Sequence, residues 1–290
     1  MGKISYMLPS VKKEYFFILL FFSILEPVFC QTDFSNAWED FFSYNNVKDF
    51  IKEDSRIYAI AYNAAFIYDL DTGMMEIISS VHGLSGKETS SLHFSVATRR
   101  FIIGYESGLI EIIDEKGKIT VANDIERLDI TGQKQINHIS ENNDMLYLST
   151  PFGIVGYDIV NLNFGDTYYI DEDSNPVFVH ETIVQDQTIY AVTEKGIYSA
   201  FTDDPNLIDF NNWLQPKGDL LGNFKSISIV DDKVFTCKST VLYQLIGFDN
   251  LLQRKSYSEN IVKLSTLENL LTVTFQKSAL VLDDNLSLVH

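Results

Sequence analysis

The sequence contains few cysteines and few basic residues. Its 290 residues include only two cysteines, Cys30 and Cys237, so a disulfide-stapled scaffold is excluded. Lys and Arg number 22 against 40 Asp and Glu, a net charge of -18, which argues against nucleic acid as a partner because its phosphates are bound through Lys and Arg. At 46% hydrophobic residues, the chain has enough apolar material for a packed core, and disordered, collagen-like and coiled-coil chains are excluded.

Complete catalytic motifs are also missing. The tripeptide Asp71-Thr72-Gly73 has no second copy, whereas an aspartic protease needs two carboxylates that share a proton, so a polar turn between two strands is favoured. Ser85 does not lie in a GxSxG motif, and the sequence has no Gly-rich phosphate loop. The five histidines are scattered singly, which leaves zinc without a motif. They are His82, His93, His138, His180 and His290.

Acidic side chains gather at two places, Asp69 with Asp71 and the run 171–173. Such carboxylates are calcium ligands, but no twelve-residue loop with ligand spacing is present, so solvated acidic loops are favoured. Cys237 lies in an apolar segment and is typical of a buried small side chain. We therefore expect a chain that is not an enzyme and that holds no cofactor and no metal.

The first thirty residues have the order of a secretory signal peptide. An apolar run of eleven residues, 15–25, is preceded by three lysines and followed by Pro27. That run is too short to span a bilayer, which takes about twenty residues. We expect residues 1–30 to be removed by cleavage after Cys30; lipidation of Cys30 is the alternative, to which the neighbouring Pro27 and Phe29 are poorly suited.

The mature chain would be more acidic still. Removal of three Lys and two Glu leaves 19 basic and 38 acidic residues, about -19. Cys237 would be the one remaining cysteine, and no second apolar stretch of about eighteen residues follows. These features predict an exported protein of the bacterial envelope.

A strand-turn-strand pattern recurs after this segment. It reads RIYAIAYNAAFIYDL from Arg56, RFIIGYESGLIEIID from Arg100, MLYLSTPFGIVGYDI from Met145 and TIYAVTEKGIYSAF from Thr188, and two weaker copies follow. The residues that enter the second strand of each copy lie 43, 45, 43, 44 and 38 positions apart: Ala65, Gly108, Gly153, Gly196, Thr240 and Ser278. A period of this length indicates a repeat architecture.

Each period has room for four short antiparallel strands, which is the blade of a β-propeller. Helical repeats of similar length need apolar residues spaced by about 3.6, and no such spacing persists. We predict an all-β fold in which residues 31–290 form a β-propeller of about six four-stranded blades. Gly108, Gly153 and Gly196 are expected at hairpin turns because glycine adopts a positive φ without steric cost.

The last period is short and contains only the beginning of an outer strand, at 286–290. A blade buries its faces only against two neighbours. We therefore expect this chain to be part of a longer polypeptide whose ring is completed downstream, with the apolar side of 271–275 exposed. A tightly closed six-blade ring is the alternative.

Aromatic residues are abundant, with 21 Phe and 15 Tyr. Five rings fall at or near predicted loops and are candidate partner-binding residues, since rings on a propeller face stack on sugars or anchor proteins. They are Tyr44, Tyr105, Phe152, Tyr168 and Trp213. Filling of gaps between twisted blades is the competing interpretation.

The order of several segments is similar to one known family. They are Trp38 with the turn 44–46, the hairpin from Ile57, HGLSG at 82–86, IIGYESGLIEII at 102–113, TPFGIVGYD and IYAVTEKGIYSA. Together, over residues 36 to 213, they resemble the N-terminal β-propeller of PorZ-like proteins, components of the type IX secretion system of Bacteroidota. PorZ-like proteins are larger, with a second propeller and a sorting domain that this sequence lacks.

The resemblance implies a non-enzymatic scaffold that is exported to the bacterial cell surface and associated with the outer membrane, with the periplasm as the alternative location. Its expected partners are a sortase-like protease and an outer-membrane barrel protein of the attachment complex, and lipopolysaccharide glycan is a further candidate. Similar hairpins occur in the periplasmic propellers of hybrid two-component sensors, so a sensory propeller that binds a polysaccharide fragment is the alternative. A propeller lyase or glycosidase is a third hypothesis, for which clustered acids are missing.

Overall fold

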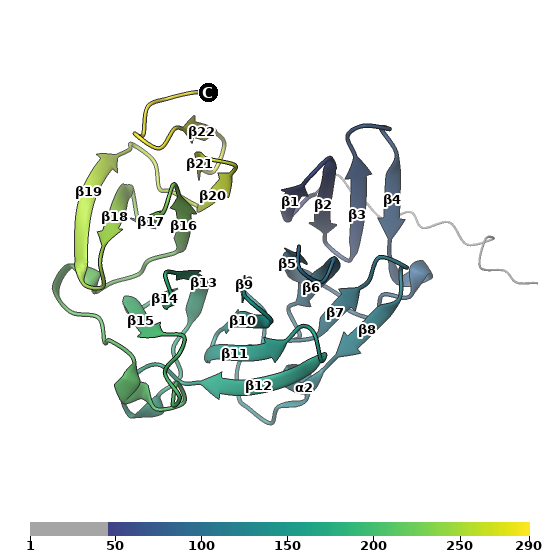
Figure 1. Cartoon of the computed structure of the whole chain (residues 1–290), viewed down its shortest axis with the longest axis horizontal. Helices are drawn as coiled ribbons and strands as arrows, with labels where there is room; N and C mark the ends of the chain where they lie inside the picture. Colours follow the sequence, from purple (N-terminus) through teal and green to yellow (C-terminus); the bar gives the residue numbers. More distant parts are fainter. Residues whose placement is uncertain (1–45) are drawn as a thin grey trace, which may run out of the picture. The chain divides into compact units, whose positions relative to one another are not determined.

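The computed structural model describes residues 46–290. The chain divides into two units, 1–39 and 40–290, and the described residues all belong to the second. The predicted signal peptide, the cleavage site at Cys30 and the candidate residue Tyr44 lie outside the described residues. Within the described part, the strands form six small antiparallel sheets and the helices are single turns, which confirms the predicted all-β propeller (Figure 1).

The first three sheets have four strands each, in chain order. Blade 1 contains β1 (Asp49–Glu53), β2 (Arg56–Ala61), β3 (Ala64–Asp69) and β4 (Met75–Ile78). Blade 2 contains β5 (Thr89–Ser95), β6 (Arg100–Tyr105), β7 (Ile110–Ile113) and β8 (Ile119–Ala122). Blade 3 contains β9 (His138–Asn142), β10 (Met145–Thr150), β11 (Gly153–Asp158) and β12 (Asn163–Tyr168).

The last three sheets are less regular. Blade 4 contains β13 (Val179–Gln185), β14 (Thr188–Thr193) and β15 (Ile197–Phe201). Blade 5 contains β16 (Ser226–Val230), β17 (Lys233–Lys238), β18 (Val241–Ile246) and β19 (Asn250–Ser256), and blade 6 contains β20 (Lys263–Leu267), β21 (Leu270–Thr274) and β22 (Ala279–Leu282). The short helices are η1 (Ser80–His82), α2 (Asp124–Arg127), η2 (Glu172–Ser174), η3 (Phe210–Asn212) and η4 (Gly218–Leu220). No helix among the described residues has the length and hydropathy needed to cross a membrane.

The core is divided among the spaces between successive blades. Between blades 1 and 2, Tyr58 and Ile60 pack with Phe94; between blades 3 and 4, Tyr147 packs with Ile189. Similar clusters fill the other three spaces. Successive side chains of a strand point to opposite faces of its sheet. Each sheet therefore presents apolar side chains to both neighbouring blades, and this two-sided burial stabilises the stack of blades.

Polar side chains link the innermost strands around the axis. Glu141 of β9 accepts hydrogen bonds from Ser95 of β5 (2.8 Å) and pairs with His93 (2.8 Å). Lys263 of β20 forms an ion pair with Asp49 of β1 at 2.6 Å, which connects the sixth sheet with the first. These partners lie about one or more blade periods apart in sequence, so the axis is held by contacts between blades rather than within them.

The burial of the sixth blade differs from the prediction. Leu271, Val273 and Phe275 are buried in the cluster shared with blade 5, so the predicted exposure of the apolar side of 271–275 is wrong. Alternation explains this, because the opposite face of the same strand carries Thr272 and Thr274, which are only partly buried. Residues near 289 pair with Val281, whose carbonyl accepts a hydrogen bond from the amide of Val289 at 2.8 Å.

The hairpin glycines have two different physical reasons. Gly108 and Gly153 have φ of 87° and 149°, which confirms the predicted positive φ at these turns. Gly196 has no positive φ, so that prediction is wrong. A Cβ at Gly196 would instead lie 2.4 Å from the Cβ of Pro216, and glycine is required because the chain passes this close.

Candidate functional site

A groove of about 690 Å³ lies between blades 3 and 4. Blade 3 contributes the turn 142–145 and side chains of β10 to β12, while blade 4 contributes Gln187 and residues 202–208 without 206. Five of its fifteen lining residues are aspartates, and none is Lys, Arg or His. The aspartates are Asp144, Asp158, Asp166, Asp203 and Asp204. The groove is therefore a strongly acidic surface with tyrosines in its floor.

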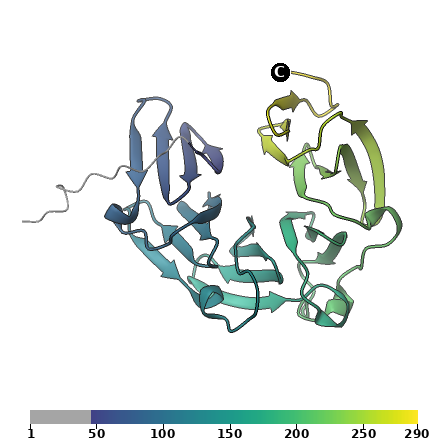
Figure 2. The ribbon, with the colours of Figure 1, turned by 180° about the vertical axis from the view of Figure 1, so that it is seen from behind.

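The irregular outer part of blade 4 creates this groove. After β15, Pro205 has no N–H to offer to a strand ladder, and the neighbouring Asp204 accepts hydrogen bonds from the amide of Asn206 (2.8 Å) and from Asn212 (3.1 Å). The chain turns here instead of pairing with β15 as a regular fourth strand. It returns only in isolated bridges, from Leu214 to Ser199 of β15 and from Leu221 to Gly196 just before β15, so the connection 202–225 runs along the outside of blade 4 (Figure 2).

Two tyrosines form the buried floor of the groove. Tyr147 of β10 is 5% exposed and Tyr168 at the end of β12 is 8% exposed. Neither hydroxyl makes a hydrogen bond with residues 46–290. Burial raises the pKa of Tyr147. Burial, with smaller effects of the nearby Tyr147 and Asp166, raises the pKa of Tyr168 to about 12. Both phenols therefore stay neutral and present free hydroxyls to the groove.

Glycine leaves room beside the Tyr168 hydroxyl. Gly156 of β11 pairs directly with Tyr147, and a Cβ built on Gly156 would lie 3.4 Å from the hydroxyl oxygen of Tyr168 and 3.3 Å from the sulfur of Met145. The absence of a side chain at this position leaves space next to that hydroxyl.

The groove carboxylates are poorly neutralised. None of the five aspartates takes part in an ion pair within the described chain. Asp158 accepts from the amides of Val160 and Asn161 and thereby holds its own turn, whereas Asp144, Asp166 and Asp203 have no side-chain hydrogen bond among residues 46–290. Since these three are exposed, their charge is directed into solvent.

Trp213 supports the wall of the groove from behind. Its indole Nε1 donates to the carbonyl of Leu207 at 2.9 Å, and its ring centre lies 6.4 Å from that of Tyr168. Trp213 is buried, so its ring contacts protein and not solvent. Two of the five predicted partner-binding residues are thus brought together at one place, Tyr168 in the floor and Trp213 beneath it.

The other predicted rings lie elsewhere in the fold. Tyr105 is buried in blade 2, where its hydroxyl donates to Glu111, and Glu111 in turn accepts from the amide and hydroxyl of Ser85 (2.7 Å each). Phe152 is buried at the β10–β11 turn and packs near Tyr169, with ring centres 6.5 Å apart. Tyr105, Phe152, Tyr168 and Trp213 are all buried, as expected for rings that fill spaces within and between blades. Partner binding by these residues stays a prediction.

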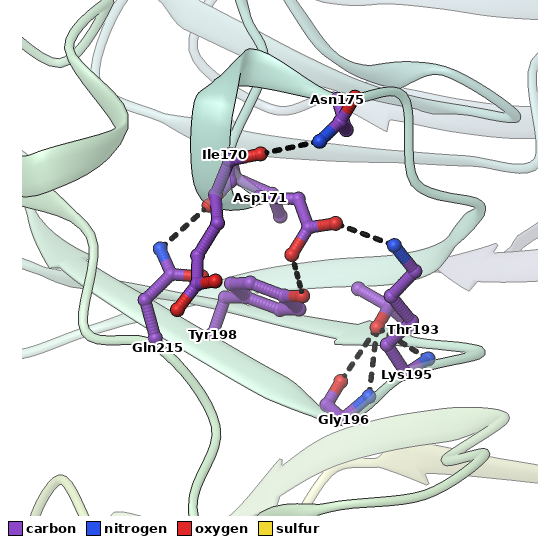
Figure 3. Close-up of polar contacts among 9 residues, drawn as sticks. Ile170, Asp171, Asn175, Thr193, Lys195, Gly196, Tyr198 and Gln215 are labelled. Atoms are coloured by element: carbon purple, nitrogen blue, oxygen red, sulfur yellow. Dashed lines mark hydrogen bonds and ion pairs between the residues drawn. The ribbon is translucent and has the colours of Figure 1, made fainter.

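A second polar network fixes the connection between blades 3 and 4 (Figure 3). Asp171 accepts a hydrogen bond from the hydroxyl of Tyr198 (2.7 Å) and pairs with Lys195 (2.5 Å). Burial alone would raise the pKa of Asp171, but the bonds from Lys195 and Tyr198 outweigh it and the pKa is lowered. The expectation of a solvated acidic loop at 171–173 is therefore wrong for Asp171, which is buried and tied to blade 4.

Two titratable groups near the axis are shielded from solvent, the partly buried His138 and the buried Glu181. Burial, with smaller effects of Lys263 and His93, lowers the pKa of His138 to about 3, and its buried Nδ1 has no partner among the described residues. His138 is thus neutral. Burial raises the pKa of Glu181 to about 7, although it accepts from the amide of Ile227 (2.8 Å) and from Ser226 (2.7 Å). Glu181 was not predicted to be special, because nothing in its local sequence shows that it faces inward.

The remaining motifs are structural in the described chain. Asp69 accepts from the amide of Thr72 (2.9 Å) and from its hydroxyl, which confirms that Asp71-Thr72-Gly73 is a polar turn, here between β3 and β4. Cys237 is buried as predicted, and burial raises the pKa of its thiol to about 12. Among residues 46–290, no group of three or more His, Cys, Asp or Glu side chains is placed to hold a metal ion.

Comparison with solved structures identifies similar propellers. PorZ of Porphyromonas gingivalis, described as an essential bacterial surface component of the type IX secretion system, has a TM-score of 0.72 and 18% identity, over 84% of this chain and 32% of that one. The extracellular domain of BT4673 from B. thetaiotaomicron, described as a hybrid two-component system, has a TM-score of 0.61 and 14% identity, over 84% and 34%. BamB from Moraxella catarrhalis has a TM-score of 0.55 and 11% identity, over 80% and 67%.

These likenesses establish the fold, and the chain spans about a third of the length of PorZ of Porphyromonas gingivalis. None of the curated proteins compared with the chain matches it. The family model described as TSS9, PorZ, N-terminal beta-propeller domain matches residues 57–214, which is more than half of the sequence. The chain therefore belongs to the PorZ N-terminal β-propeller family of the type IX secretion system.

Proposed function

We propose that this chain is a non-enzymatic, cell-surface binding component of the type IX secretion attachment machinery. The observation that carries the proposal is the family match over residues 57–214. Its partners are proteins of the attachment complex, namely a sortase-like protease and an outer-membrane barrel protein. A propeller suits this role because its connections and turns offer large surfaces while the stacked blades stay rigid.

Charge limits how lipopolysaccharide takes part. The net charge of -18 and the acidic groove both repel an anionic glycan. Any contact with lipopolysaccharide is therefore made by a local pocket away from the groove, and direct adhesion over the whole surface is disfavoured. Glycan binding that collapses steeply with added salt would contradict this.

Partner capture in the native host tests the proposal. The gene product, tagged at its own chromosomal locus, is crosslinked in intact cells and isolated from outer-membrane fractions for mass spectrometry. We expect enrichment of the sortase-like protease and the barrel protein relative to an untagged strain. Recovery of neither protein, with the tagged chain in the cytoplasm, would refute the proposal.

The structural similarity to the BT4673 extracellular domain favours one second candidate, a sensory propeller that binds a polysaccharide fragment. A sensor controls transcription, so deletion of its gene changes expression of a polysaccharide-utilisation locus while secreted cargo matures normally. Deletion of the gene of a surface scaffold leaves expression of that locus unchanged and prevents normal cargo maturation. Sequencing of the gene beyond His290 adds a direct criterion, because a sensor of this type needs a membrane span and kinase motifs downstream.

A further inference from the structure

We propose that the groove between blades 3 and 4 binds a basic segment of a protein partner, with one or two Arg or Lys side chains placed among its aspartates. This inference deepens the proposed function, and its biological meaning rests on that function. The occupant is identified by charge complementarity, since five aspartates and no basic residue line the groove.

The charge of the groove has no counterpart within the described chain. Asp144, Asp166 and Asp203 have neither an ion pair nor a side-chain hydrogen bond among residues 46–290 and are exposed. Elsewhere the described chain does pair its carboxylates, as in Lys195 with Asp171 and Lys263 with Asp49. A cation from outside would therefore find acceptors that need not first be released from an internal partner.

The tyrosines add an observation independent of charge. Tyr147 and Tyr168 are more than nine-tenths buried as residues, line the groove and make no side-chain hydrogen bond among the described residues. Their hydroxyl oxygens face the groove and have no protein partner to give up, so they are open acceptors for a ligand's donors. With their raised pKa values they stay neutral and accept hydrogen bonds from guanidinium or ammonium groups without adding charge.

Guanidinium chemistry fits this set of acceptors well. Arg has five donors in a planar fork that matches carboxylates, while Lys offers three donors around a point charge. The walls also carry the apolar surface of Leu207 and Ile208, which suits the methylene stems of both side chains. The walls are set in advance, because Asp158 and Asp204 hold their turns and Trp213 anchors Leu207.

Peptide binding by the full chain tests the assignment. The probe is a capped acetyl-Gly-Arg-Gly-Arg-Gly-amide peptide, with citrulline in place of both Arg as the neutral control and a neutral maltohexaose as the glycan control. Affinity is measured by isothermal titration at about 0.05 M and about 0.5 M salt. We expect saturable binding of the Arg peptide, weakened about tenfold by the higher salt, and binding of neither control.

Matched variants locate the binding. Asp166→Asn with Asp203→Asn removes two exposed groove charges, and Asp129→Asn with Asp219→Asn removes two exposed charges outside the groove. The groove pair should weaken the Arg peptide about tenfold and the outer pair less than about twofold. The double variant Tyr147→Phe and Tyr168→Phe should weaken it several-fold with an unchanged melting temperature, because the lost hydroxyls have no partner in the described chain.

The outcomes separate the alternatives. Equal losses in the two aspartate pairs would show nonspecific attraction to an acidic protein and overturn the assignment. Equal binding of the citrulline peptide, or binding of maltohexaose, would show a neutral or glycan ligand and also overturn it. Binding as predicted together with normal cargo maturation in a deletion strain would refute the proposed function alone.

Discussion

Glu181 gives the chain a pH-dependent stability that can be predicted from its surroundings. The carboxyl is buried between blades 4 and 5, and burial raises its pKa from an ordinary value of 4.5 to about 7. The hydrogen bonds from Ile227 and Ser226 and the nearby charge of Lys263 oppose that shift without cancelling it. Between these two pH values, the folded chain holds a proton that the unfolded chain has lost.

The sign and size of the effect follow from proton linkage. Because the pKa is raised on folding, the stability contributed by Glu181 is fully present below pH 4.5 and is lost as the pH rises to about 7. A rise of this size corresponds to about 3 kcal/mol of unfolding free energy, at about 1.4 kcal/mol for each pKa unit. Glu181→Gln mimics the protonated carboxyl and should remove this dependence.

Urea denaturation of the wild type and of Glu181→Gln between pH 4 and pH 8 measures the effect. We expect the variant to be equal to or slightly less stable than the wild type near the acidic end, and more stable by about 1 to 3 kcal/mol at pH 8. Ser228→Ala, at a buried position of β16, serves as the control, since it removes a hydrogen bond to Thr266 of β20 but no titrating group. A difference between wild type and Glu181→Gln that is constant with pH would refute the reasoning.

Three further predictions concern other parts of the described fold. Asp171→Asn should cost about 1 to 3 kcal/mol near neutral pH in urea denaturation and progressively less as the pH falls through the lowered pKa of Asp171, and a cost independent of pH would contradict this. Gly196→Ala should cost about 1 to 3 kcal/mol because its Cβ would overlap Pro216, whereas Gly165→Ala, with no atom closer than 3.6 Å, should be nearly neutral. Cys237 should resist alkylation at pH 8 until the chain unfolds, and rapid labelling of the folded chain would show that blade 5 opens.

The repeated hairpins could be predicted from the sequence because they depend on the local alternation of apolar and polar residues. The hairpins that start at Arg56, Arg100 and Met145 coincide with β2–β3, β6–β7 and β10–β11. Each of these segments has apolar residues on both faces, so the pattern alone determines its place between two blades.

The groove could not be predicted from the sequence, because it depends on where segments that are distant in the sequence meet. Asp144 and Asp166 belong to separate parts of blade 3, and they share a groove with Asp203 only through the packing of blade 4 against blade 3. The one local signal was the DDPN sequence after β15, which marks a turn and the end of regular pairing. Tyr168 and Trp213 were singled out for their positions near loops, and their burial agrees with the competing interpretation that such rings fill gaps between blades.

The central claim, that the chain acts at the surface in type IX secretion, is tested most directly by cargo maturation. In a strain that lacks the whole gene, the molecular mass and surface attachment of a cargo protein with a sorting signal are followed by immunoblotting of cell and medium fractions, with the gene restored as the control. We predict unprocessed cargo that is no longer attached to the surface, and recovery on restoration. Fully processed, attached cargo in the deletion strain would contradict the account.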